Sequence, residues 1–251
     1  VSKLCLGCMG FGEPERGREK WSIGEAESRE VIKKALDSGI NFFDTANLYS
    51  AGSSEEIVGK ALKDFANRDE IVLASKLYFP MFDGPNAKGL SRKSIFAEID
   101  HSLKRLQTDY LDLYIIHRWD YGTPIEETME ALHDLVKMGK VRYIGASSMH
   151  AWQFAKAQFI AEKNGWTKFV SMQNLYNLLY REEEREMIPL LQDRKVAMTP
   201  WSPLAGGRLT RDIGAITARA SQAVQADLPA YIVASDNEVI SRVHKLADER
   251  G

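Results

Sequence analysis

The feature that most constrains this chain is its alternation of short apolar runs with stretches of helical spacing. Runs such as residues 71–74 and 113–116 lack alternating polar residues, which is typical of strands buried on both faces of a parallel sheet. Seven runs end near Cys8, Asp44, Lys76, His117, Ala146, Gln173 and Pro200. Strands that alternate with helices in this way predict an α/β fold with a parallel sheet.

The spacing of these runs predicts a barrel. Their ends follow one another at intervals of roughly 32 residues, and an eighth unit would complete a (β/α)8 TIM barrel. The length of 251 residues suits one such domain, so we expect residues 1–251 to form a single barrel domain. The last helical stretch, 239–246, leaves no room for an eighth strand, and residue 1 is not Met. We therefore expect a barrel that is incomplete at its C-terminal end, in a chain that lacks both ends of a longer protein.

Local signals predict where several helices begin. Ser53 and Glu56 have the spacing of a capping box, and Thr123 with Pro124 and Glu126 should cap another helix. Asp236 is the expected cap of the last helix. Further helices are expected around residues 31–36, 95–106, 152–159 and 186–191.

Composition excludes several classes of function. The formal charge is only -2, so no basic excess indicates nucleic acid or an acidic membrane as a partner. No apolar run spans a bilayer and no signal-peptide pattern opens the chain, which favours the cytoplasm. Cys5 and Cys8 form a C-x-x-C without a second pair, and on a strand they would point to opposite faces, so we expect neither a zinc site nor a redox pair. The histidines show no metal-ligand spacing, and we expect no metal.

Four polar residues follow three neighbouring strands of the predicted barrel. Asp44, Lys76 and His117 end strands, and Tyr49 lies in the loop after Asp44. Each alone could be a helix cap or a packing residue, but the carboxyl ends of barrel strands meet at one mouth. There Lys76 would lower the pKa of Tyr49, Asp44 would hold the lysine, and His117 could hydrogen-bond a carbonyl oxygen or assist proton transfer. Lys76 could also act as a Schiff-base nucleophile.

Several motifs resemble the aldo-keto reductase family. They are NFFDTANLY at residues 41–49, ASK at 74–76, IIH at 115–117, VRYIGASS at 141–148, SMQN at 171–174 and PWSPLAGG at 200–207. Within the family, the bacterial branch related to potassium-channel β subunits is the most similar. The resemblance implies NADPH-dependent reduction of aldehydes or ketones to alcohols, with Tyr49 as the general acid and a small carbonyl compound as substrate.

The same resemblance implies a cofactor site without a Rossmann domain. The G-x-G at Gly10 and Gly12 continues with Glu15 where the fingerprint needs a third glycine, in agreement with this. The implied contacts are Cys8 and Met9 beside the nicotinamide, Ser147, Ser148 and Gln173 on its carboxamide, Trp201 stacked on its ring, and Ser202, Pro203, Leu204, Ala205 and Gly206 along the pyrophosphate. Many relatives have Asn in place of Ser148. Trp119 is a candidate wall for the substrate.

Two other functions remain open at this stage. A regulatory subunit could bind the cofactor and turn over poorly, although such relatives carry Asn at the position of His117. A Schiff-base aldolase could use Lys76 with Tyr49 and Asp44. The oligomeric state cannot be derived from these patterns.

Overall fold

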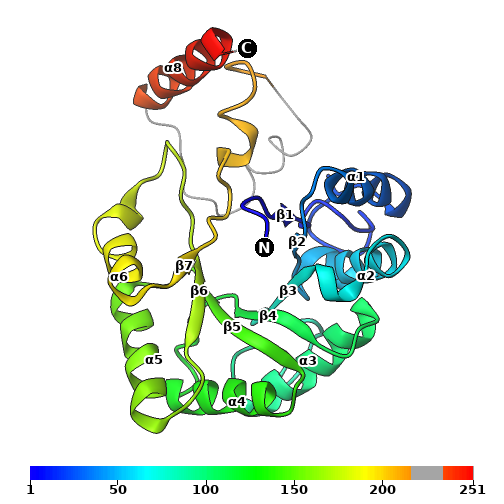
Figure 1. Cartoon of the computed structure of the whole chain (residues 1–251), viewed down its shortest axis with the longest axis vertical. Coiled ribbons are helices and arrows are strands. Elements are labelled where there is room, and N and C mark those ends of the chain that lie inside the picture. Colours follow the sequence, from blue (N-terminus) through cyan, green and yellow to red (C-terminus); the bar gives the residue numbers. More distant parts are fainter. Residues whose placement is uncertain (216–233, 251) are drawn as a thin grey trace. The chain divides into compact units, whose positions relative to one another are not determined.

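A computed structural model describes residues 1–215 and 234–250 of the chain (Figure 1). The strands in this described part follow one another through the sheet in chain order, and each pair with an assigned register is parallel. They are β1 (Leu6–Gly7), β2 (Phe42–Asp44), β3 (Val72–Leu77), β4 (Leu111–Ile116), β5 (Val141–Ser147), β6 (Phe169–Gln173) and β7 (Ala197–Met198). The predicted α/β fold of the barrel type, with alternating strands and helices, is confirmed.

The chain divides into two compact units, Val1–Ser171 and Met172–Gly251, and β6 crosses the boundary between them. The units are described separately below, and the single domain expected for residues 1–251 stays a prediction. Among the described residues, no helix is both long enough and apolar enough to cross a membrane.

The first unit consists of β1 to β5, the first part of β6, and the helices that connect these strands. The longer helices are α1 (Glu25–Asp37), α2 (Ser53–Phe65), α3 (Arg92–Leu106), α4 (Ile125–Lys137) and α5 (Ala151–Asn164). They lie along one side of the sheet of this unit (Figure 1). Strand residues such as Leu73, Ile115 and Ile144 are almost fully buried. Apolar strand residues buried in this way explain why these runs show no polar alternation.

Two expected helix caps are wrong. Ser53 is the first residue of α2, and its hydroxyl donates to the carbonyl of Ser50 and accepts from the N–H of Glu13, so it does not cap the helix. The Thr123 hydroxyl donates to Asp120, and Pro124 occupies the cap position of α4. In both places a polar group outside the helix competes with the local capping pattern.

The second unit contains the end of β6, a 3-10 turn at Glu182–Glu184, α6 (Met187–Arg194), β7, a 3-10 turn at Ala205–Gly207 and α8 (Ala234–Arg250). Pro189 is tolerated in α6 because it lies in the first turn of that helix. Asp236 was expected to cap the last helix, but it lies inside α8 and accepts a hydrogen bond from Arg208 at 3.0 Å. The buried carboxylate is therefore used to hold the loop after β7 against α8.

Candidate active site

Parallel register brings the polar strand ends of the first unit together. Asp44 is the last residue of β2 and lies opposite Ala74 of β3, while Lys76 of β3 lies opposite Ile115 of β4. His117 follows β4 directly, and its N–H donates to the carbonyl of Leu77. Tyr49 begins the short turn Tyr49–Gly52 between β2 and α2. Long apolar strands thus place four polar side chains at one edge of the sheet.

Lys76 is the centre of this group. Its side chain is fully buried, and Nζ donates to Asp44 Oδ2 at 2.6 Å, to the carbonyl of Thr45 at 2.7 Å and to the Tyr49 hydroxyl at 3.1 Å. Burial alone would favour the neutral amine, but Asp44 and Tyr49 raise the pKa of Lys76 above its ordinary value. The three donors of the ammonium group match these three oxygens. Lys76 is therefore held as a cation beside the phenol.

The pKa of Tyr49 departs from its ordinary value in the opposite direction to our expectation. Burial raises this pKa, the charge of Lys76 lowers it, and Asp44 raises it again, so the result lies above the ordinary value. We expected a lowered pKa because the sequence indicates the ammonium group of Lys76 nearby but does not indicate how deeply Tyr49 is buried. A phenol in this setting keeps its proton at neutral pH and is suited to donate it.

His117 is a neutral imidazole in this site. Its ring meets Tyr49 edge-on with centroids 5.9 Å apart, and it meets Phe79 in the same manner at 5.1 Å. Burial, together with the charges of Lys76 and Arg118, lowers the pKa of His117 well below its ordinary value. Its buried Nδ1 has no hydrogen-bond partner within the described part of the chain. A neutral ring can donate a hydrogen bond to an oxygen but does not supply a proton as imidazolium.

The backbone that carries Tyr49 has an unusual conformation. Ser50 and Ala51 have φ of 44° and 50°, and Gly52 follows with φ of 89°, so three successive residues are left-handed. The buried carboxylate of Glu19 accepts the N–H of Ser50 at 3.2 Å. Gly17 packs so closely that a Cβ there would lie 2.4 Å from the Ser50 Cα. Sequence reasoning missed this support for Tyr49, because no residue type in the turn signals a left-handed run.

Cys8 lies next to the same group of residues. Its N–H donates to the carbonyl of Asp44 at 2.8 Å, and its own carbonyl accepts the hydroxyl of Ser54 at 2.8 Å. Burial and the nearby Asp44 raise the pKa of the Cys8 thiol, so it stays protonated. Met9 is partly exposed, and Cys5, which precedes β1, is exposed. These positions leave Met9 accessible to a ligand at the strand end.

Ser147 is the last residue of β5 in the first unit, and Ser148 follows it. Ser147 is buried, and the two hydroxyl oxygens lie 3.2 Å apart. Ser148 has a φ of 52°, a conformation that Asn adopts more readily than most residues. This conformation suits the expectation that many relatives carry Asn at this position.

The remaining predicted cofactor residues belong to the second unit. Gln173 ends β6 and is buried, and Trp201 pairs with Leu175 and donates its N–H to the carbonyl of Asn174. The segment after Trp201 comprises Ser202, Pro203, Leu204, Ala205 and Gly206, of which Ser202, Ala205 and Gly206 are left-handed. The N–H groups of Ala205 and Gly207 donate to carbonyls of the same loop. Of the backbone donors expected for a pyrophosphate, the Ala205 N–H is thus already used.

Trp119 lies two residues after His117, in the loop between β4 and α4. It is partly buried, and its ring lies 6.0 Å from that of Trp152 at an angle of 59°. The pair joins this loop to α5, and a role for Trp119 against a substrate stays a prediction.

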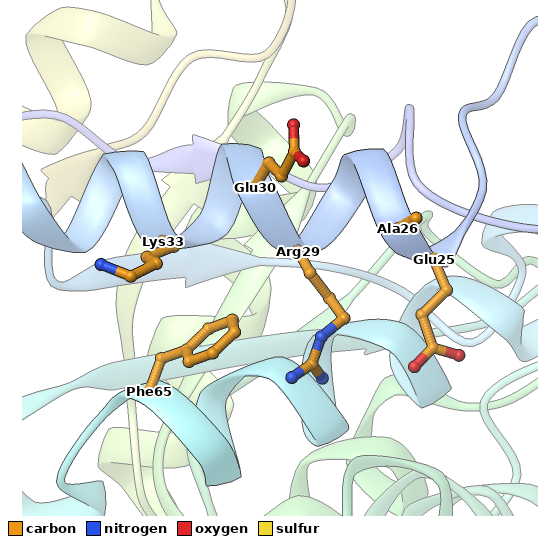
Figure 2. Close-up of a pocket in the computed structure, with 6 residues that line it drawn as sticks. All are labelled: Glu25, Ala26, Arg29, Glu30, Lys33 and Phe65. Atoms are coloured by element: carbon orange, nitrogen blue, oxygen red, sulfur yellow. The ribbon is translucent and has the colours of Figure 1, made fainter.

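A separate groove of about 580 Å³ lies between α1 and the end of α2. Figure 2 shows the side chains of Arg29 and Phe65 meeting across this groove, with Glu25 and Lys33 along its length. Arg29 pairs with Asp64 at 2.6 Å and lies over the Phe65 ring. Its lining contains none of the residues described above, and Glu25, Arg29 and Lys33 form ion pairs with residues outside the lining, so we assign it no role in the site.

Comparison with known proteins identifies related chains. The model of the family described as "Aldo/keto reductase family" matches residues 3–251. Versiconal hemiacetal acetate reductase of Aspergillus parasiticus is 46% identical, over 100% of this chain and 78% of the relative. A protein of Schizosaccharomyces pombe, named provisionally as an aryl-alcohol dehydrogenase, is 50% identical over 86% of this chain and 67% of its own length. An aldo-keto reductase of Alternaria alternata is 46% identical over 100% of this chain and 74% of the relative.

These relatives are fungal, whereas the motifs led us to expect the bacterial branch related to channel β subunits. The family is confirmed, and the narrower branch is not supported by these matches.

Proposed function

This chain belongs to the aldo/keto reductase family of oxidoreductases, and from that premise we propose that it reduces aldehydes or ketones to alcohols with NADPH. Family membership supports the use of a nicotinamide cofactor and a small carbonyl substrate in general terms. The choice of NADPH and the roles of individual residues are our proposal. Because two relatives carry the names of a reductase and of an aryl-alcohol dehydrogenase, aromatic aldehydes are the first substrates to test.

The observation that carries the proposal is the contact of Lys76 Nζ with Asp44, Thr45 and Tyr49. A bound nicotinamide supplies the hydride. Tyr49 donates its proton to the carbonyl oxygen, and Lys76 stabilises the phenolate that remains. Asp44 holds the ammonium in place, and neutral His117 directs a hydrogen bond at the same oxygen. The raised pKa of Tyr49 keeps the proton in place until the oxygen gains charge.

The residues at the ends of β5 and β6 fit a nicotinamide. In the first unit, the paired hydroxyls of Ser147 and Ser148 offer both donors and acceptors for a carboxamide. In the second unit, Gln173 and Trp201 supply an amide and a partly exposed aromatic ring. We propose that Trp201 stacks on the nicotinamide, that Cys8 and Met9 border it, and that Ser202 to Gly206 line the pyrophosphate.

The geometry disfavours a Schiff-base aldolase. An amine must lose its proton before it attacks a carbonyl, and all three donors of Lys76 already face oxygens. The elevated pKa of Lys76 acts in the same direction. Borohydride trapping on Lys76 in the absence of any nicotinamide would support the aldolase instead.

The test is a carbonyl panel assayed for NADPH oxidation, with the alcohol product quantified against the NADPH consumed. We expect one alcohol per NADPH for aromatic aldehydes. Tyr49→Phe should lower kcat by about 10² to 10⁴, since positioned acid catalysis contributes that much, and should leave the NADPH Kd nearly unchanged. A Tyr49→Phe variant that reduces aldehydes at the normal rate would remove Tyr49 from the role of acid.

A further inference from the structure

Arg118 follows His117 directly and borders the candidate active site. Its guanidinium donates to the carbonyl of His117 at 3.1 Å and lies 5.7 Å over the ring of Phe79. Phe79 in turn meets the ring of His117 edge-on. The guanidinium therefore belongs to the layer of side chains that begins at Tyr49 and continues through His117 and Phe79.

Arg118 differs from other partly buried arginines of the first unit, because no described residue of that unit forms an ion pair with it. Arg68 pairs with Asp112 at 2.7 Å, and Arg105 pairs with Glu55 at 2.6 Å. No described residue of that unit supplies a carboxylate to Arg118, whose hydrogen bond goes to a neutral carbonyl. Burial lowers the pKa of the Arg118 guanidinium, in agreement with a partly buried charge that has no paired carboxylate in this unit. A charge in that condition gains free energy when an anion binds.

The nearest acidic side chain in sequence is committed elsewhere. Asp120 accepts the N–H of Leu90 at 2.7 Å, the N–H of Gly122 at 2.9 Å and the hydroxyl of Thr123 at 2.8 Å. These three hydrogen bonds engage both carboxylate oxygens and tie the loop after β4 to Leu90 in the loop after β3. Asp120 is therefore unable to turn toward Arg118 without breaking them.

Within the described residues of the first unit, the charges around the reacting group are not fully paired. Asp44 balances Lys76 and the imidazole of His117 is neutral, so Arg118 is a cation without a paired carboxylate in this part of the chain. The charges of Lys76 and Arg118 both lower the pKa of His117. A small anion near this edge of the sheet would be attracted to the guanidinium.

We infer that Arg118 binds a carboxylate carried by the substrate, so that the enzyme prefers aldehydes or ketones that bear an anionic group. This inference rests on the proposed function and gives it a substrate class. The guanidinium presents a planar fork that matches two carboxylate oxygens, and Phe79 supports one face of that fork. Arg118 is thus a residue that determines specificity, while Tyr49 and its partners carry out proton transfer.

A phosphate of the cofactor presents the same anionic oxygens as a carboxylate. We favour the substrate because Arg118 adjoins His117, which we propose to contact the substrate carbonyl. The two sources are separated by measuring cofactor affinity and substrate preference in the same variants.

The experiment compares 4-carboxybenzaldehyde with its neutral methyl ester in the wild type, Arg118→Met and Arg118→Lys. We expect the wild type to favour the carboxylate in kcat/KM. Arg118→Met should lower the acid-to-ester ratio by about tenfold to a hundredfold, which corresponds to one charge-assisted hydrogen-bonded pair. Most of the loss should appear in KM, and Arg118→Lys should retain part of the preference because it keeps the charge without the fork. Arg142→Met, at the amino end of β5, is the matched control and should leave the ratio unchanged.

Each outcome decides between the alternatives. A wild type that reduces acid and ester equally well overturns the inference and leaves the proposed function standing. A raised NADPH Kd in Arg118→Met, with an unchanged ratio, assigns Arg118 to the cofactor and also overturns it. If no carbonyl compound is reduced, the proposed function fails, and the anion site is then tested by calorimetry with 4-(hydroxymethyl)benzoate. Binding to the wild type that Arg118→Met abolishes supports the anion site. Equal binding to both proteins, or no binding to either, refutes it. Should Arg118→Met fail to fold by circular dichroism, Arg118→Lys carries the comparison.

Discussion

The two units of the chain hold predicted site residues of contrasting character. In the first unit, Lys76 is fully buried and Tyr49 is nearly so, and the two side chains are joined by a hydrogen bond. In the second unit, Trp201 is only partly buried, Leu204 is 54% exposed, and the loop is held by its own backbone hydrogen bonds. Enclosure fixes protonation states, whereas exposed rings and loops provide surface for a ligand. The proposed function accordingly assigns the chemistry to the first unit and a binding role to the second.

We expect the largest loss of stability and activity when Lys76, the centre of the buried group in the first unit, is replaced. Lys76→Met leaves the carboxylate of Asp44 buried without its cation, which costs about 3 to 5 kcal/mol of folding free energy. It also removes the charge that stabilises the phenolate, so kcat should fall by at least about 10². The apparent pKa of the tyrosine step in the pH profile should rise. Denaturant unfolding and the pH dependence of carbonyl reduction measure these effects.

Lys60→Met is the matched control for Lys76→Met. Lys60 pairs with Glu25 at 2.9 Å on the surface between α2 and α1, where such pairs contribute about 1 kcal/mol or less. We expect it to leave kcat and the pH profile unchanged. A Lys76→Met variant with the wild-type pH profile would show that Lys76 and Tyr49 are not coupled.

Replacing Gly17 tests whether the backbone next to Tyr49 contributes to catalysis by positioning the phenol. Gly17→Ala places a Cβ 2.4 Å from the Ser50 Cα, so the left-handed run after Tyr49 must shift. A displacement of about 1 Å at a catalytic group can cost 10²-fold in rate, and we expect kcat to fall by about 10- to 100-fold. The control is Gly24→Ala, where a Cβ meets nothing within 4 Å. Similar kcat values for the two variants would remove the run at 50–52 from the positioning of Tyr49.

The sequence predicts the strand ends of the first unit well. Asp44 and Lys76 lie at the ends of sequence runs whose residues are apolar on both faces of the strand. Such a run can be recognised from residues adjacent in the sequence. The capping box at Ser53 is wrong because the N–H of Glu13, 40 residues away in the chain, competes for the hydroxyl. A local pattern carries no information about such a distant partner.

Protonation and loop conformation were harder to predict than position. The direction of the Tyr49 pKa depends on the balance between burial and Lys76, and the degree of burial emerges only when the chain folds. The left-handed Ser50 and Ala51 leave no signal, because non-glycine residues seldom adopt this conformation. In the second unit, only the resemblance indicated the loop after Trp201, and it did not reveal that the Ala205 N–H is used internally.

Replacing Trp201 tests whether the second unit contributes to cofactor binding. Trp201→Ala removes the aromatic face proposed for the nicotinamide, and stacking of aromatic rings contributes about 0.5 to 1.5 kcal/mol. The NADPH Kd should therefore rise by roughly twofold to tenfold, with a smaller change in kcat at saturating cofactor. Fluorescence titration with NADPH and steady-state kinetics separate the two quantities. A lower kcat without any change in the NADPH Kd would mean that Trp201 acts in the chemical step. The proposed division of roles between the two units would then be wrong.

The smallest expected effect concerns the neutral charge state of His117. Its pKa in the folded protein lies well below the ordinary value of about 6.5, so the unfolded chain binds a proton here that the folded protein does not. The free energy of unfolding should therefore fall as the pH is lowered through about 6.5, and from pH 7 to pH 5.5 this one group contributes about 1 kcal/mol of the loss. His117→Asn and His117→Gln remove the titration and should lose that much less stability over the same interval, whatever their stability at pH 7. Urea unfolding of the three proteins at both pH values measures the difference. Parallel losses in all three would mean that His117 is protonated equally in the folded and unfolded chains, and its place as a neutral donor in the buried group would have to be abandoned.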